Sequence, residues 1–265
     1  DTVSQHFATA GLMRSDVVIG IGGGMVTDVA GFAAASWHRG TAVVHVSTTL
    51  VGMVDAAIGG KTGVNLAQGK NLVGAFWQPT GVICDLDALE TLPAREMRCG
   101  LGEVAKYHFL TGDDLLSLEM TERIARCVEI KAKIVAADER EQDNRVVLNY
   151  GHTLGHALER SSNFALAHGE GVAIGIVFAA HVAHAMKRID EARLAYYYTV
   201  VRDTYGLAVA PPSGMQRAEL IELMWRDKKA VSGLTFVLDG PKGIEVVAGV
   251  DEKYLQAAFD AIQLP

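Results

Sequence analysis

The chain has 265 residues, 49% of them hydrophobic and 21% charged, with a formal net charge of −7 at pH 7. This size and hydrophobic content predict a soluble globular protein with a large core, divided between two domains. The net negative charge argues against nucleic acid as a partner, because binding to phosphate backbones requires a basic face that this composition does not supply.

The other bulk features favour a cytoplasmic protein. Three widely spaced cysteines, without a Cys-x-x-Cys pair, indicate a reducing compartment and no disulfides. The most apolar run, residues 172–186, falls short of a membrane span, so we predict a buried helix there and no membrane partner. The chain begins at Asp1 without a signal peptide and enters a predicted strand at about residue 16, which indicates a segment of a longer protein.

An apolar run at residues 16–21 ends in three consecutive glycines and is followed by a helical composition at residues 25–35. The order strand, glycine loop, helix suits a phosphate group, because backbone N–H groups approach closely at glycine and a helix N-terminus favours an anion. A glycine triplet alone is as often a simple turn. Here the flanking strand and helix favour a nucleotide loop at Gly22, Gly23 and Gly24.

Residues 41–47 form a second predicted buried strand, which leads to Thr48 and Thr49. The βαβ order implies a Rossmann-like parallel sheet with ligands at the strand ends. Residues 59–62 resemble part of a P-loop but have Asp55 where the first glycine would stand, so a P-loop is excluded. Two lysines and an amide lie in Gly-rich loops, where they either bind a ligand anion or are plain surface charge: Lys61, Lys70 and Asn71.

From Pro93 onward the composition is mainly helical, and proline is frequent at a helix start. We therefore divide the chain into an α/β domain at residues 1–88 and a mainly helical domain at residues 89–265. Residues 234–238 form a short predicted strand, followed by a turn at Gly240 and Pro241.

Two histidines four residues apart, His152 and His156, lie on one face of a predicted helix. His168 opens the next helix, and Glu103 lies upstream in a glycine-rich run. Imidazole and carboxylate groups from separate elements are typical ligands of a catalytic divalent site with an open position. The alternative is a set of ordinary core histidines, the more frequent role of any single histidine, but the set as a whole favours a metal site.

Together these residues resemble the 3-dehydroquinate synthase family of sugar phosphate cyclases. The likeness runs in unbroken order from about residue 14 to residue 240, so it is specific although each piece is weak. The motifs that carry it are Gly22-Gly-Gly-x-x-x-Asp28, Arg39-Gly40, Thr48-Thr-Leu50, Val54-Asp55, Gly59-Gly-Lys-Thr62, Gly69-Lys-Asn71, Gly100-Leu-Gly-Glu-Val-Ala-Lys106, Lys131-Ala-Lys133, Asp138-Glu-Arg-Glu141, Asn149-Tyr-Gly-His-Thr-Leu-Gly-His156, His168-Gly-Glu170 and Asp227-Lys-Lys229. The family's first strands and helices, which help to hold the adenine half of NAD, precede Asp1, so the resemblance implies an NAD domain incomplete at its N-terminus.

The resemblance implies an α/β Rossmann-like domain followed by a helical metal-binding domain, with NAD and a divalent metal, zinc or cobalt, as cofactors. The substrate would be 3-deoxy-D-arabino-heptulosonate 7-phosphate, and the products 3-dehydroquinate and phosphate, in the shikimate route to chorismate and the aromatic amino acids. Transient oxidation, phosphate elimination, reduction and an intramolecular aldol leave NAD as it began, so the implied enzyme is a phosphorus–oxygen lyase.

The resemblance also assigns site residues position by position. The metal ligands would be Glu103, His152 and His168, which makes His156 a neighbour of the metal or an acid/base group on the phosphate side. Contacts to NAD would come from Gly22, Gly23, Gly24, Asp28, Thr48, Thr49 and Lys70. Contacts to the substrate would come from Asp55, Lys61, Asn71, Lys106, Lys131, Arg145, Asn149 and Lys228. Arg39 matches an arginine that reaches the neighbouring subunit's phosphate site, which implies a homodimer.

Three other functions stay open at this point. An aminodehydroquinate synthase or another cyclase of secondary metabolism shares the fold. The stretch from Tyr107 to Thr121 is short and has an unusual Tyr-His-Phe, so it departs from the family's commonest member. A metal-dependent polyol or alcohol dehydrogenase shares the glycine loop and a helical metal domain, but it needs no cationic phosphate site and would accumulate NADH. The third alternative is a non-catalytic nucleotide-binding fragment.

Overall fold

The computed structural model of the chain describes residues 2–66, 69–228 and 234–264. These form two compact units, one of Asp1–Met97 and Met120–Arg140, the other of Arg98–Glu119 and Glu141–Pro265. Helix α4 (Met120–Ala137) packs against the short helix η2 (Gly52–Ala56) in the first unit, although the sequence assigns it to the second domain. The functional boundary between residues 88 and 89 stays a prediction.

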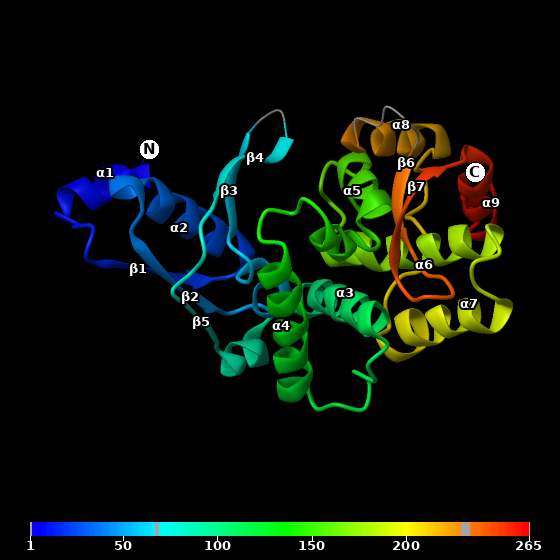
Figure 1. The fold of residues 1–265 in the computed structure, drawn as a ribbon, viewed down its shortest axis with the longest axis horizontal. Helices are drawn as coiled ribbons and strands as arrows, with labels where there is room; N and C mark the ends of the chain where they lie inside the picture. Colours follow the sequence, from blue (N-terminus) through cyan, green and yellow to red (C-terminus); the bar gives the residue numbers. More distant parts are fainter. Residues whose placement is uncertain (1, 67–68, 229–233, 265) are drawn as a thin grey trace. The chain divides into compact units, whose positions relative to one another are not determined.

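A parallel sheet of order β1-β2-β5 forms the centre of the first unit (Figure 1). Its strands are β1 (Val17–Gly22), β2 (Ala42–Ser47) and β5 (Gly81–Cys84), and helix α2 (Gly24–Ser36) joins β1 to β2 and packs on both. Val18, Ala34 and Val43 form a buried core between strands and helix. The predicted strand, glycine loop, helix and second strand are therefore confirmed.

A β-hairpin of β3 (Lys61–Leu66) and β4 (Gly69–Phe76) follows the sheet's first two strands. The prediction that two lysines and an amide lie in loops is therefore wrong, since all three lie on the strands of this hairpin: Lys61, Lys70 and Asn71. Gly63 faces Gly74 across the hairpin, and a Cβ at Gly74 would lie 2.0 Å from the Thr62 carbonyl oxygen. These glycines permit close strand pairing here, although glycine in a sequence usually indicates a loop.

The second unit is mainly helical. Helix α3 (Ala94–Thr111) begins directly after Pro93, as predicted, and its residues from Arg98 onward belong to this unit. Helix α6 (His168–Ala185) is buried along most of its length and packs against α5 (His152–Ser161), α7 (Glu191–Tyr198) and α9 (Glu252–Ala261). This confirms the buried helix predicted at residues 172–186. The remaining elements of the two units are α1 (Thr2–Thr9), η1 (Trp37–Arg39), η3 (Leu86–Thr91), η4 (Asn144–Asn149), η5 (Thr199–Thr204) and α8 (Arg217–Lys228).

An antiparallel pair of strands, β6 (Leu234–Leu238) and β7 (Glu245–Val250), lies among these helices. The strand predicted at residues 234–238 is confirmed, and residues 241–244 form the turn after it. Strand β7 was not expected from the mainly helical composition. It pairs with β6, whose side chains are mostly buried against α6 and α8.

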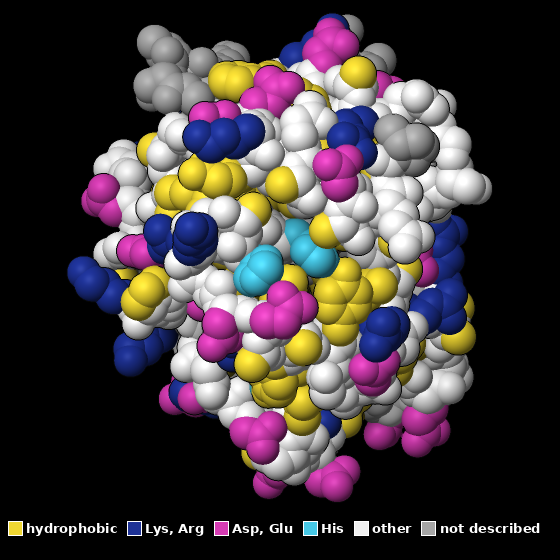
Figure 2. Space-filling view, turned by 90° about the vertical axis from the view of Figure 1, so that its right-hand side faces the viewer, with side chains coloured by type: hydrophobic (Ala, Val, Ile, Leu, Met, Phe, Trp, Pro, Cys, Tyr) yellow, Lys and Arg dark blue, Asp and Glu magenta, His cyan; other side chains and the backbone are white. Residues whose placement is uncertain are grey.

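The surface carries interspersed charges on the face drawn in Figure 2, where acidic and basic side chains alternate with hydrophobic ones. Within the described ranges, no helix combines the length and the apolar character that crossing a lipid bilayer would require.

Candidate metal centre and nucleotide loop

Glycines bring the backbones of α3, α5 and α6 into contact in the second unit. A Cβ at Gly102 of α3 would lie 2.0 Å from the carbonyl oxygen of Gly169 in α6, and one at Gly169 would lie 1.7 Å from the Cys99 carbonyl oxygen. A Cβ at Gly175 of α6 would lie 1.9 Å from the carbonyl oxygen of Gly151, the residue directly before α5. Only glycine permits such close approach, so these three helices cross at fixed points.

Each crossing point has a predicted metal ligand beside it. Glu103 follows Gly102, and His168 precedes Gly169. His152 directly follows Gly151, whose φ of 80° lies in the left-handed region that favours glycine. The three candidate ligands are therefore neighbours in sequence of glycines at which the helix backbones meet.

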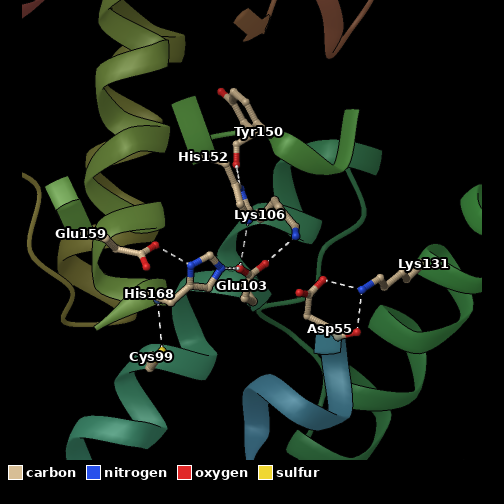
Figure 3. A network of polar contacts seen from close by, with 10 residues as sticks. Asp55, Cys99, Glu103, Lys106, Lys131, Tyr150, His152, Glu159 and His168 are labelled. Atoms are coloured by element: carbon tan, nitrogen blue, oxygen red, sulfur yellow. Dashed lines mark hydrogen bonds and ion pairs between the residues drawn. The ribbon is translucent and has the colours of Figure 1, made fainter. Parts of the chain in front are cut away.

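The three side chains converge on one carboxylate oxygen (Figure 3). His168 Nε2 lies 2.9 Å and His152 Nε2 lies 3.5 Å from Glu103 Oε1. Ligand atoms around a tetrahedral zinc are about 3.3 Å apart when each lies about 2.0 Å from the ion, so these separations suit one ion. Glu103 is fully buried and His152 is nearly so, which limits competition from water.

The opposite side of each ligand is also fixed by a contact. His152 Nδ1 donates to the Tyr150 carbonyl oxygen at 3.0 Å, and His168 Nδ1 lies 2.7 Å from Glu159 Oε1. Both partners are acceptors, so Nδ1 of each ring carries a hydrogen, and Nε2 is the nitrogen that faces Glu103 and whose lone pair would be available to an ion bound there. Lys106 Nζ lies 2.5 Å from Glu103 Oε2, which leaves Oε1 for an ion. This donor set fits a divalent metal with open coordination positions.

The electrostatics of the two imidazoles differ. Burial lowers the pKa of His152 to about 4, although Glu103 opposes the shift, so this ring is neutral as a ligand must be. Burial also acts to lower the pKa of His168, but hydrogen bonds to Glu103 and Glu159 outweigh it and raise the pKa to about 10. Burial alone would raise the pKa of Glu103, yet Lys106 and the two histidines hold it well below its usual range. A divalent cation here would compete with the proton that His168 holds.

Three further predicted residues of the second unit lie near these ligands in sequence. His156 is not in the trio around Glu103, and its ring centroid lies 5.3 Å from that of His152 and 6.0 Å from that of His168. Asn149 Nδ2 donates to Glu141 Oε1 at 2.9 Å, and Arg145 is almost completely buried on η4. Lys228 ends α8, and its side chain lies outside the described residues, as does Lys229.

The first unit holds the residues predicted to contact NAD. Gly23 precedes α2 without a side-chain cap, and a Cβ there would lie 2.8 Å from Thr49 Cγ2. The Thr48 amide donates to the Gly22 carbonyl oxygen at 3.0 Å, which ties the end of β2 to the glycine loop. The structure therefore brings the glycines and both threonines together at the carboxyl ends of β1 and β2. Lys70 is separate from them in sequence, on β4.

Two predicted substrate contacts form an ion pair in the same unit. Lys131 Nζ lies 2.7 Å from Asp55 Oδ1 and donates to the Asp55 carbonyl oxygen at 2.6 Å. Both residues were assigned to the substrate from separate motifs, and α4 and η2 bring them into contact. Arg39 ends η1 with a φ of 61°, beside His38 with a φ of 47°.

Asp28 should make stability depend on pH. Burial and the nearby Asp55 carboxylate raise its pKa to about 7, although Lys131 opposes the shift. The unfolded value is about 3.9, so the native state binds more protons between these two values and loses stability as pH rises through this window. Asp28→Asn removes the effect. We expect the free energy of unfolding of Asp28→Asn minus that of wild type, both measured by urea denaturation without NAD, to increase from pH 4 to pH 8. The same difference at both pH values would contradict this.

Two residues that support the ligands have no predicted role in the site. Glu159 and the Tyr150 carbonyl group each hold one imidazole from behind. Glu159 lies seven residues after His152, which is the same face of α5, so helical spacing could have indicated it. No spacing rule indicates a main-chain carbonyl group as an acceptor.

Comparison with known proteins agrees with this geometry. Two family descriptions match the chain, 3-dehydroquinate synthase N-terminal over residues 1–99 and 3-dehydroquinate synthase C-terminal over residues 100–230. The chain belongs to the 3-dehydroquinate synthase family. It is 44% identical over 268 residues to the 3-dehydroquinate synthase of Rhodococcus opacus (strain B4), an alignment that covers 95% of this chain and 72% of the relative.

The chain is also similar to a second relative in sequence and to a solved structure. A relative from Amycolatopsis mediterranei (strain S699), provisionally named an aminodehydroquinate synthase, is 56% identical over 255 residues, covering 96% of this chain and 72% of the relative. The crystal structure of 2-deoxy-scyllo-inosose synthase complexed with carbaglucose-6-phosphate, NAD+ and Co2+ has a TM-score of 0.88 and 25% identity. That match covers 97% of this chain and 77% of the other, so the fold is that of a sugar phosphate cyclase.

Proposed function

We propose that the chain converts 3-deoxy-D-arabino-heptulosonate 7-phosphate to 3-dehydroquinate and phosphate, the family's step of the shikimate pathway. The observation that carries this proposal is the trio of Glu103, His152 and His168 around one oxygen, in a chain that also holds a strand–glycine–helix loop. A metal centre and a nucleotide loop suit a reaction that oxidises and later reduces its substrate.

A bound divalent ion would polarise a substrate hydroxyl group, and bound NAD would accept and return a hydride. The chain's own residues hold and orient these groups. Glu103, His152 and His168 would ligate the ion. Gly22, Gly23 and Gly24 would admit the NAD phosphates against the backbone, beside Thr48 and Thr49.

Cationic side chains would hold the departing phosphate group. Elimination places negative charge on the leaving oxygen, and a positioned ammonium or guanidinium group stabilises that charge. Lys61, Lys106, Lys131 and Arg145 are the candidates, with Asn71 and Asn149 as amide contacts to the substrate. Much of the rate enhancement would come from positioning, since proton loss, elimination and ring closure occur within one bound molecule.

The direct test measures the balance of products. The enzyme with NAD and Co2+ should release one phosphate for each 3-deoxy-D-arabino-heptulosonate 7-phosphate consumed, without growth of NADH absorbance. Steady accumulation of NADH would instead identify a dehydrogenase, because that enzyme does not return the hydride.

A second substrate candidate is the amino-substituted heptulosonate phosphate used by an aminodehydroquinate synthase. The identity of 56% to the relative provisionally named for that activity, against 44% to a 3-dehydroquinate synthase, favours this candidate. Competition between the two substrates separates the candidates: the one with the larger kcat/KM is the preferred substrate.

Lys61 offers a separate test of the phosphate site, because its side chain is exposed on the hairpin and its replacement should not disturb the core. Lys61→Met should lower kcat/KM by roughly 10²-fold if one charge-assisted contact to the phosphate is lost, while NAD affinity changes little. Phosphate release and equilibrium NAD titration measure the two effects. Equal losses in both would assign Lys61 to NAD.

We also propose a homodimer in which Arg39 reaches the partner subunit's phosphate site, as the family resemblance implies. Arg39→Ala should then lower turnover but leave the affinity for NAD unchanged. Sedimentation of the wild-type protein as a monomer at assay concentrations, with full activity, would contradict this.

A further inference from the structure

We propose that Glu159 is a positioning residue that holds the metal ligand His168 from behind and raises the affinity of the site for a divalent ion. This inference rests on the proposed metal site. It adds a fourth side chain, one that touches neither the ion nor the substrate but determines how one ligand is presented.

The geometry of Glu159 supports this role. Its side chain is 3% exposed, and its Oε1 lies 2.7 Å from His168 Nδ1 (Figure 3). Glu159 comes from α5, two helical turns beyond His152, whereas His168 is the first residue of α6. A buried carboxylate is costly unless hydrogen-bond donors compensate it, and one such donor here is the imidazole of a predicted ligand.

Glu159 could instead be a ligand itself, because His156, Glu159 and His168 also lie within 4.8 Å of one another through their ligand atoms. A neutral imidazole, however, has one lone pair, and the hydrogen must lie on its other nitrogen. When His168 Nε2 faces an ion at Glu103, its Nδ1 carries the hydrogen and donates to Glu159. His168 therefore cannot be a ligand in the trio around Glu103 and in the trio with His156 and Glu159 at once.

The trio around Glu103 is the better supported of the two. His152 Nδ1 donates to the Tyr150 carbonyl oxygen, which directs Nε2 of that ring toward Glu103 as well. Nε2 of both imidazoles thus faces one carboxylate oxygen, where both lone pairs would be available to an ion, and Glu159 is left as the acceptor behind His168.

The two ligands are supported unequally. The acceptor behind His152 is a neutral carbonyl group, whereas that behind His168 is a carboxylate. Hydrogen bonds to an ionised acceptor are roughly twice as strong as neutral ones, and they make the imidazole a better electron donor. Loss of the Glu159 charge should therefore weaken metal binding even where the ring orientation is kept.

The experiment is a titration of the full chain with Co2+, followed by the visible d–d absorption and by metal analysis. Glu159→Ala should weaken Co2+ binding by roughly 10- to 100-fold, and Glu159→Gln, whose amide oxygen can still accept from Nδ1, by less. The matched control is Glu170→Gln. Glu170 lies two residues after His168, and its Oε2 accepts from the Ala167 amide at 3.2 Å, so the control removes a nearby charge from α6 without changing the ligand contact.

Positioning is supported if Co2+ affinity is highest in wild type and the control, lower in Glu159→Gln and lowest in Glu159→Ala, with one Co2+ per chain in all four proteins. Equal affinity in all four proteins overturns it while the metal site stands. A second Co2+ equivalent that is lost in both Glu159 variants also overturns it, since Glu159 would then be a ligand. Failure of wild type to bind Co2+ would refute the proposed metal site itself. Thermal unfolding of each protein separates a weakened site from a lost fold.

Discussion

Replacing His152 by alanine is expected to abolish stoichiometric binding of a divalent ion and to lower turnover on the order of 10³-fold or more. His152 supplies one of the two imidazole nitrogens that meet Glu103 Oε1, at 3.5 Å from that oxygen. Two ligands remain after the change, which is fewer than catalytic sites of this kind use. The charge stabilisation supplied by a bound metal ion is worth several kcal/mol, and each 1.4 kcal/mol is about tenfold in rate.

The matched control is His156→Ala. His156 lies one helical turn further along α5, with its ring centroid 5.3 Å from that of His152, but it is outside the trio around Glu103. This variant should keep one metal ion per chain, and any loss of activity should appear in kcat with metal content unchanged. Metal analysis after dialysis, together with phosphate release, measures both variants. Retention of the ion by His152→Ala and its loss from His156→Ala would exchange the two roles.

Part of the candidate site could be read directly from the sequence. Residue type and spacing indicated a metal site that included His156, and the family resemblance reduced its ligands to Glu103, His152 and His168. The structure brings these three residues together around one oxygen. Their supports were harder to foresee. Lys106 and Glu103 form an ion pair three residues apart on one helix, which spacing could indicate. The contact of Glu159 with His168 instead depends on how α5 packs against α6.

The fold shows the same division between local and distant information. The strand, glycine loop and helix at the start of the sheet were predicted because their signals are contiguous. The hairpin of β3 and β4 was missed, since its lysines, asparagines and glycines have low strand propensity. The pairing of Gly63 with Gly74 lets the two strands approach closely, but it depends on residues that are distant in sequence. The placement of α4 with the first unit likewise depends on its contact with η2, which no local pattern encodes.

The crossing of α3 and α6 leads to a second prediction with a large effect, Gly169→Ala. The added Cβ would lie 1.7 Å from the Cys99 carbonyl oxygen, a backbone atom that cannot rotate away. The Gly169 amide also donates to Cys99 Sγ at 3.1 Å, so separating the helices would break this contact as well. We expect a loss of about 3 kcal/mol or more in the free energy of unfolding, at the upper end of the usual cost of overpacking.

Gly171→Ala is the control for this prediction, because it places the same methyl group on the same helix two residues later. Its Cβ would lie 3.1 Å from the Gly155 carbonyl oxygen, a tight contact that a small shift can relieve, and alanine gains about 1 kcal/mol of helix propensity over glycine. Urea denaturation of the metal-free proteins should therefore show Gly169→Ala far less stable than Gly171→Ala. Because His168 is the neighbour of Gly169, Co2+ affinity should fall in the first variant and stay near wild type in the second. Equal stability of the two would mean that α3 and α6 are not in backbone contact at this point, and the origin of the ligand geometry would then lie elsewhere.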